Sequence, residues 1–222
     1  MKIIVTTCDE YLHILKGFAY MFNKHWSPGT EVTILGYSVP SFDLPNNFKF
    51  ISIGKQERND RDWTSALIPF FKQLPEEYFI SLLDDMYVLN TNKPLLHEAE
   101  KHMAKGIEKI HLTNMSGRTG VFEKEKDVNF NVLKQDAKYR LSLQPSFIGR
   151  DYFLKYLNPG KSIWKYETNH GDPKNDGAQI LMPKQDIVSY SNFVRGGKIS
   201  DSVQISKIRK EDLNAIKQLG VF

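Results

Sequence analysis

The stretch FISLLDDMYVL, residues 79–89, contains two adjacent acidic residues at the end of an apolar run. The run YFISLL, residues 78–83, has the composition of a buried strand, and Asp84 and Asp85 follow it directly. Two neighbouring carboxylates repel each other, and burying one without a partner costs free energy. The pair therefore either faces water, with Asp84 capping a turn, or lies against a positive charge.

Strand-like and helix-like patterns alternate along the first half of the chain. The strand-like runs are residues 2–8, 31–37, 48–54 and 78–83, and the helical patterns cover residues 11–22, 63–74 and 93–104. Asp62 is placed to cap the second helix, and Pro69 predicts a kink or a shorter helix there. This alternation predicts an α/β fold with a mostly parallel central sheet flanked by helices.

The second half of the chain is less regular. Strands are expected over residues 108–115 and 186–194 and within 139–149, where the strand ends at Gln144-Pro145 or slightly past it. Helices are expected over 150–157, from Ser162 onward, and over 209–220. Residues 114–138 are polar and contain glycine, so they are the best candidate for a mobile loop near a site.

Polar residues lie at the ends of two predicted strands. TTCD, residues 6–9, follows the first strand, and LDDM, residues 83–86, follows the fourth. Ligands of open parallel sheets bind beyond the carboxyl ends of the strands. Carboxylates at such an edge suit Mg²⁺ or Mn²⁺, which are held by one or two carboxylates together with substrate phosphates.

Composition narrows the class of protein. The single cysteine, Cys8, excludes an internal disulfide and any cysteine cluster for metal, which is compatible with a reducing compartment. The N-terminal apolar stretch is too short for a signal-peptide core, and no stretch approaches a membrane span of ~20 apolar residues. We therefore expect a cytoplasmic protein without a transmembrane segment. The formal charge of +4 is only weak support for an anionic ligand.

Five blocks of the sequence carry a family resemblance. KIIVTTCDEYL, DWTSAL, YFISLLDDMYVL, SLQPSFIGRDYFLKYL and SIWKYE, in that order, resemble the small GT-A-fold glycosyltransferases encoded by large DNA viruses, phages and some bacteria. The resemblance implies one Rossmann-like GT-A domain over residues 1–222, with a nucleotide-binding half at 1–112 and an acceptor-binding half at 113–222. It also implies transfer of a sugar from a nucleoside diphosphate sugar to an acceptor hydroxyl, with inversion, and the host cytoplasm as the location if the protein is viral.

The acid pair corresponds to the motif with which that family binds its metal. The resemblance implies that Asp85 holds a divalent metal, Mn²⁺ or Mg²⁺, and that Asp84 contacts the ribose or the sugar. The family motif separates its two aspartates by one residue, whereas here they are adjacent. This departure leaves open which acid binds the metal.

Further residues are assigned to the nucleotide sugar by the same resemblance. Thr6 and Thr7 would contact the base and ribose, although β-branched residues are also common in strands. Asp62 and Trp63 resemble an acid-aromatic pair near the nucleotide, but a helix cap followed by a core tryptophan explains them equally well. Arg195 and Lys198 flank two glycines, so this segment could approach the diphosphate, although basic glycine turns are common on surfaces.

Glu167 is the candidate general base. An inverting transfer needs a carboxylate that takes the proton of the acceptor hydroxyl, and Glu167 lies three residues after Trp164. Trp164 would then form an apolar wall for a sugar, and Gln144 could bind a sugar hydroxyl. The alternative interpretation is that Glu167 is only a surface acid. His170 could serve as another base or as a metal ligand, although an isolated histidine is more often neither.

Two other classes of function fit the same residues. A non-catalytic protein with a GT-A-like fold could bind sugar nucleotide or nucleic acid. A nucleotidyltransferase would also use acids and a metal, but no glycine-rich phosphate loop with a lysine follows the first strand. The acceptor of a glycosyltransferase could be a glycan, a lipid-linked sugar, a protein or a modified DNA base.

Overall fold

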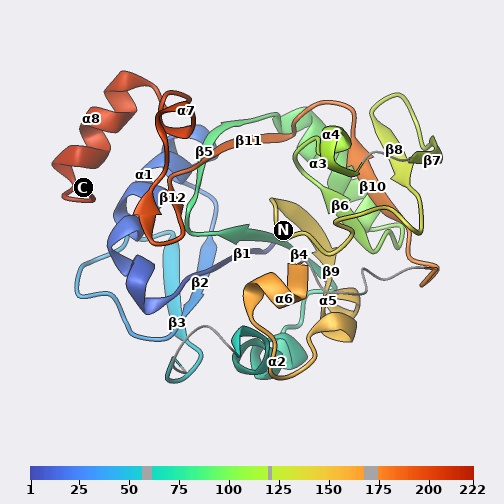
Figure 1. The fold of residues 1–222 in the computed structure, drawn as a ribbon, viewed down its shortest axis with the longest axis horizontal. Helices are drawn as coiled ribbons and strands as arrows, with labels where there is room; N and C mark the ends of the chain where they lie inside the picture. Colours follow the sequence, from blue (N-terminus) through green and yellow to red (C-terminus); the bar gives the residue numbers. More distant parts are fainter. Residues whose placement is uncertain (57–61, 120–121, 168–174) are drawn as a thin grey trace. The chain divides into compact units, whose positions relative to one another are not determined.

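The computed structural model describes residues 1–56, 62–119, 122–167 and 175–222. These residues form a mixed α/β fold with a large central sheet flanked by helices, which confirms the predicted fold class (Figure 1). The chain forms two compact units. Unit 1 comprises Met1–Lys2, Gln56–Ser81 and Asn92–Ile187, and unit 2 comprises Ile3–Lys55, Leu82–Thr91 and Val188–Phe222.

Unit 2 contains the parallel strands that the first half of the sequence predicts. Its strands in order across the parallel sheet are β3 (Phe48–Ser52), β2 (Val32–Gly36) and β1 (Ile3–Thr6). Every residue of β1 and β2 is buried, as expected for apolar runs covered on both faces. Two antiparallel pairs complete the unit: β5 (Met86–Thr91) with β11 (Val188–Asn192), and β12 (Val194–Arg195) with β13 (Lys198–Ile199).

The helices of unit 2 are the 3₁₀ helix η1 (Asp9–Ile14), α1 (Leu15–His25), α7 (Ser202–Ile205) and α8 (Lys210–Gln218). The predicted helix at 11–22 therefore begins as a 3₁₀ turn. Helix α1 packs against β5 and is contacted by two other helices, η1 and α8, while α7 packs against β11. Helix α8 lies beside α1 (Figure 1), where the buried carboxylate of Asp212 accepts from Lys24 Nζ at 2.6 Å and from the Tyr20 hydroxyl at 3.0 Å.

Unit 1 is built on a mixed sheet. Its strand order is β4 (Tyr78–Leu83), β9 (Ser146–Gly149), β6 (Lys109–His111), β10 (Ile180–Pro183), β8 (Phe130–Leu133) and β7 (Phe122–Glu125). Among the described strands of this unit, β6 and β10 pair in parallel, and the other neighbouring pairs are antiparallel. The last two residues of β4, Leu82 and Leu83, belong to unit 2.

The helices of unit 1 follow the predicted positions closely, except for α4 (Ser116–Thr119), which was not predicted. They are α2 (Trp63–Gln73), α3 (Lys93–Met103), α4, α5 (Arg150–Tyr156) and α6 (Ile163–Glu167). Asp62 caps α2 as predicted, because its Oδ1 accepts from Ser65 N at 2.9 Å. Helix α2 continues past Pro69 to Gln73, so of the two effects expected from the proline, a shorter helix is not found, and the kink stays a prediction.

Two expectations for the second half of the chain were wrong. Residues 114–138 are not an irregular loop, because the described part contains α4 and the β7–β8 hairpin. The strand expected over 139–149 forms only at Ser146–Gly149. Pro145 supplies no backbone N–H for a ladder, and the preceding residues turn, with Tyr139 at a φ of 62°. Among the described helices, none is long and apolar enough to cross a membrane.

Candidate functional site

Asp84 and Asp85 form the turn between β4 and β5, beside the end of β1. Asp84 N donates to Thr6 O at 3.3 Å, and Thr7 Oγ1 donates to Asp84 Oδ2 at 2.5 Å. The Asp84 residue is only 4% exposed, whereas Asp85 is half-buried. The two polar strand ends that the sequence singles out therefore meet within unit 2.

Burial and mutual repulsion shape the electrostatics of this turn. Burial raises the pKa of Asp84 well above its usual range, and the neighbouring charge of Asp85 raises it further, against the hydrogen bond from Thr7. Burial, with the charge of Asp84 adding to it, also raises the pKa of the Cys8 thiol to about 12, so Cys8 stays protonated. Burial and the charge of Asp85 both disfavour ionisation of Asp84, so a cation bound at the turn would stabilise the charged form of the acid pair.

The glycine hairpin consists of β12, β13 and the Gly196-Gly197 turn between them, and it contacts η1, the helix that follows β1. Arg195 pairs with Lys198 across the β12–β13 turn, and Gly196 and Gly197 have φ values of +56° and +77°. A two-residue turn with both central φ values positive favours glycine, which explains the sequence. Gly197 N donates to the hydroxyl of Tyr11 in η1 at 2.8 Å.

Other contacts connect these elements to the acid turn. Phe193 N, just before β12, donates to Asp85 O at 2.7 Å. The charges of Asp84 and Asp85 contribute to the raised pKa of Tyr11, of which burial is the largest cause. The structure therefore brings six predicted site residues into one region of unit 2. They are Thr6, Thr7, Asp84, Asp85, Arg195 and Lys198.

Thr6 has a buried hydroxyl that makes no hydrogen bond to a described residue. Buried hydroxyls normally have a partner, so an unused one next to the acid turn is a feature that a bound ligand or a water would explain. Thr7 differs, because its hydroxyl already donates to Asp84.

The remaining predicted residues lie in unit 1. Glu167, at the end of α6, is half-buried, and its Oε1 accepts from Leu143 N at 2.6 Å and from Ser142 Oγ at 3.4 Å. Gln144, which follows Leu143 in the chain, is half-buried. Trp164, on α6, is 57% exposed, so its ring is accessible to a ligand. His170 lies outside the described residues.

Asp62 and Trp63 have structural roles in unit 1. Besides Ser65 N, Asp62 Oδ1 accepts from Gly160 N at 2.9 Å, which joins the start of α2 to the loop before α6. Trp63 is buried, and its ring packs edge-on against Phe153 and Tyr166. The helix-cap and core explanation therefore describes this pair, and its contact with a nucleotide stays a prediction.

Sequence reasoning missed two residues that hold these groups in place. Tyr11 fits the apolar stripe of the helix predicted over residues 11–22, which favours core packing over stacking on a base, but it is half-buried and its hydroxyl accepts from Gly197 N. Lys109 is buried in β6, and its Nζ donates to Ser142 O at 2.5 Å and to Arg140 O at 3.0 Å. The available signal was a lysine at the start of the predicted strand EKIHLTNM, residues 108–115, since a buried ammonium needs specific partners.

The comparisons with known proteins rest on structure. No family model and no curated protein matches the sequence. A mannosyltransferase from Pyrobaculum calidifontis, PcManGT, in complex with GDP-Man and Mn²⁺, matches with a TM-score of 0.54 and 14% identity over 88% of this chain and 57% of its own. This chain has the GT-A fold.

Two further solved structures match most of this chain. A UDP-glucose pyrophosphorylase complexed with UDP-glucose matches at a TM-score of 0.51 and 10% identity, over 98% of both chains. TarS 1–349 from S. aureus matches at 0.48 and 17% identity, over 86% of this chain and 59% of that one. The chain with the GT-A fold thus spans less than two thirds of the mannosyltransferase and of TarS, and likeness at these identities establishes the fold alone.

Proposed function

We propose that this protein is a metal-dependent glycosyltransferase that moves a sugar from a nucleoside diphosphate sugar to an acceptor hydroxyl, with inversion at the anomeric carbon. The observation that carries the proposal is the acid turn: Asp84 is buried against Thr7, and Asp85 is half-buried beside it, at the end of β1. Two GT-A neighbours carry nucleotide sugars, GDP-Man with Mn²⁺ in one and UDP-glucose in the other.

The donor set of the acid turn fits a hard divalent cation, Mn²⁺ or Mg²⁺. Adjacent carboxylates with a raised Asp84 pKa form a site that a cation would stabilise, and oxygen is the ligand these ions prefer. Asp85 is the more accessible acid and is assigned to the metal, while Asp84, tied to Thr7, is assigned to the ribose or sugar. When bound, the metal would offset negative charge on the departing diphosphate.

The glycine hairpin and the strand end would bind the rest of the donor. Arg195 and Lys198 are exposed cations on either side of Gly196 and Gly197, so the hairpin can present both charge and a close backbone to a diphosphate. The hydroxyl of Thr6, which has no partner among the described residues, can exchange a hydrogen bond with the nucleoside.

Glu167 is proposed as the general base. Its carboxylate is oriented by Leu143 N and Ser142 Oγ. During transfer the acceptor oxygen bonds to the anomeric carbon, the bond from that carbon to the diphosphate breaks, and the hydroxyl proton passes to Glu167. The exposed ring of Trp164 would cover an apolar sugar face, and Gln144 would bind a sugar hydroxyl.

Nucleotidyl transfer is the second candidate function. It is favoured by one observation: the pyrophosphorylase is matched over almost the full length of both chains. The two reactions cleave different bonds of the same donor. Glycosyl transfer yields a nucleoside diphosphate and a glycoside, whereas pyrophosphorolysis yields a nucleoside triphosphate and a sugar 1-phosphate.

A product analysis separates the candidate functions. A panel of nucleoside diphosphate sugars is incubated with the protein and Mn²⁺, with glycan, lipid-linked sugar, protein or modified-DNA acceptors, or with pyrophosphate instead. Release of nucleoside diphosphate without pyrophosphate, with the sugar transferred to an acceptor or to water, supports the proposal. Release of nucleoside triphosphate that requires pyrophosphate would replace it with nucleotidyl transfer, and binding of a donor without any turnover would leave a binding protein.

A further inference from the structure

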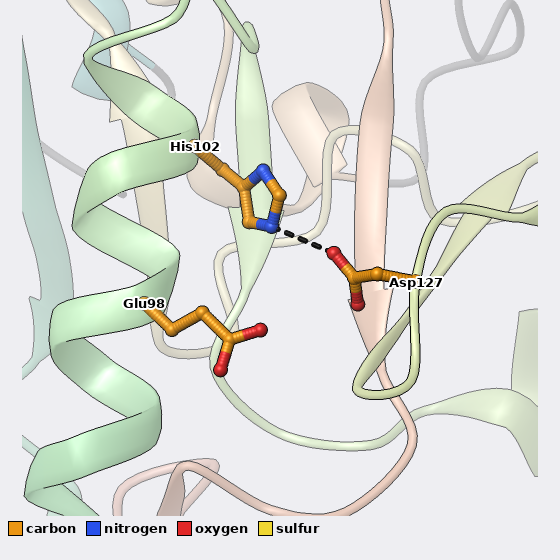
Figure 2. A group of neighbouring side chains, drawn as sticks. All are labelled: Glu98, His102 and Asp127. Carbon is orange, nitrogen blue, oxygen red and sulfur yellow. Dashed lines mark hydrogen bonds and ion pairs between the residues drawn. The ribbon is translucent and has the colours of Figure 1, made fainter.

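Three side chains with metal-ligand chemistry converge in unit 1, on elements that the donor site does not use. Glu98 and His102 are four residues apart on α3, so they lie on the same face of the helix. Asp127 comes from the turn of the β7–β8 hairpin. Figure 2 shows the three side chains pointing toward one another, with a contact between His102 and Asp127.

The distances between their ligand atoms suit one small ion. One ligand atom of each residue lies within 4.8 Å of the other two, and His102 Nε2 is 2.9 Å from Asp127 Oδ2. Three such atoms fit within a circle of radius about 2.8 Å, so sub-ångström shifts bring them to the ~2.0–2.2 Å of zinc bonds to nitrogen and oxygen. The three residues are half-buried, which shields an ion without sealing it off.

The two carboxylates are held by neighbouring donors. Asp127 Oδ1 accepts from Asn129 N and Phe130 N, both at 2.9 Å, which leaves Oδ2 directed at His102. Asn129 Nδ2 donates to Glu98, at 2.8 Å to Oε2 and 3.1 Å to Oε1. Such outer contacts, which orient a ligand without occupying all of its oxygen lone pairs, are typical of metal sites.

A hollow beside the cluster gives room for a fourth ligand. It has a volume of about 400 Å³, and His102, Lys105 and Lys126 are among the residues that line it. Three protein ligands with an adjacent space are the arrangement in which zinc keeps a water or another small ligand in its fourth position.

We propose that Glu98, His102 and Asp127 form a Zn²⁺ site that fastens the β7–β8 hairpin to α3. An imidazole with two carboxylates suits zinc, whereas Mg²⁺ prefers oxygen ligands alone and keeps several of its waters. The site is separate in sequence and chemistry from the acid turn, and its existence does not depend on the proposed function.

The test is a calorimetric titration with ZnCl₂ alone on the full chain, first stripped of metal with a chelator. The titrated protein carries Asp85→Ala, which removes the metal ligand proposed for the acid turn, so the measured heat of binding comes from the new site. One equivalent of Zn²⁺ should bind. His102→Ala and Asp127→Asn should each weaken the affinity at least about tenfold, and Asn129→Ala, which disturbs only the outer contacts, about 10- to 100-fold.

His97→Ala is the matched control, because His97 is an exposed histidine on the same helix. The affinity of the His97→Ala variant for Zn²⁺ should equal that of the parent. Asp127→Asn keeps an acceptor for Asn129 N and Phe130 N, so it also serves if His102→Ala does not fold. Thermal melts provide a second readout, with Zn²⁺ but not Mg²⁺ raising the melting temperature. Absence of zinc binding, or equal binding by His102→Ala and Asp127→Asn, would reduce the cluster to a His-Asp hydrogen bond.

Discussion

Thr7 Oγ1 donates to Asp84 Oδ2 across 2.5 Å and joins the residue after β1 to the first acid after β4. The bond holds in place a carboxylate whose burial raises its pKa, so the native protein binds a proton at Asp84 that the unfolded chain releases. The free energy of unfolding of the metal-free protein should therefore fall as pH rises from the unfolded pKa, near 3.9, toward the raised folded value.

Asp84→Asn should remove this dependence. The amide keeps an acceptor for Thr7 but carries no charge, so the variant should be more stable than the parent at pH 7 and lose less stability between pH 4 and pH 8. Urea denaturation at several pH values measures this. Thr7→Val should instead destabilise the protein by about 1–3 kcal/mol at pH 7, because the buried acid loses its donor, while Thr7→Ser should stay close to the parent. An Asp84→Asn profile that parallels the parent would contradict this assignment.

Gly17 is required by the close approach of α1 to β5. A Cβ built at Gly17 would lie 2.3 Å from Tyr87 Oη, whose hydroxyl donates to Ile14 O at 2.8 Å. Alanine normally stabilises a helix interior by up to ~1 kcal/mol relative to glycine, but here Gly17→Ala should destabilise by about 1–3 kcal/mol through overpacking. Gly29→Ala is the control, because its nearest contact is 3.7 Å away. A more stable Gly17→Ala variant in chemical denaturation would disprove the steric argument.

Tyr11 should act on donor affinity through the glycine hairpin. Tyr11→Phe removes the acceptor for Gly197 N, and a hydrogen bond of about 0.5–1.5 kcal/mol corresponds to a roughly 2- to 10-fold weaker Kd for the nucleotide sugar. The turnover number at saturating donor should not change. Tyr156→Phe, which removes a hydroxyl bonded to Asp176 in unit 1, should leave donor binding intact. Calorimetry with the donor and Mn²⁺ compares the two, and equal Kd values would remove Tyr11 from the donor site.

Lys109 is expected to position Glu167. Its Nζ holds Ser142 O, and the next peptide N–H, from Leu143, donates to Glu167 Oε1 at 2.6 Å. Lys109→Met leaves two buried carbonyl oxygens short of a donor, so it should destabilise by about 1–3 kcal/mol and lower kcat while the donor KM stays unchanged. Normal kcat in a folded but less stable variant would make Lys109 a structural residue only.

The sequence patterns predicted the structural elements that residues adjacent in the chain determine. The β-branched runs of β1 and β2, the cap at Asp62 and the acid turn after β4 depend on neighbouring residues, and each was located correctly. The β7–β8 hairpin was missed because its exposed strand β7, FEKE, has no apolar face toward a core. The strand expected at 139–149 failed because the buried side chains there belong to a turn that Lys109 holds from β6.

The contacts that build the candidate sites are mostly distant in sequence. Tyr11 and Gly197 are 186 residues apart, and Thr7 and Asp84 are 77 apart, so no periodicity indicates either bond. Glu98 and His102 have helical spacing, but Asp127 joins them only through the hairpin. Residue types at strand ends could be predicted, whereas their partners required the fold.

The most direct test of the account is the affinity of a nucleoside diphosphate sugar measured with and without Mn²⁺, in the parent, in Asp85→Ala and in His102→Ala. We predict that Mn²⁺ strengthens donor binding at least about tenfold in the parent and in His102→Ala, and that Asp85→Ala abolishes this dependence. The assignment of the acid turn as the metal and nucleotide-sugar site would be contradicted by either of two results. One is a donor affinity in the parent that is the same with and without Mn²⁺, and the other is an effect of Mn²⁺ in Asp85→Ala that equals its effect in the parent.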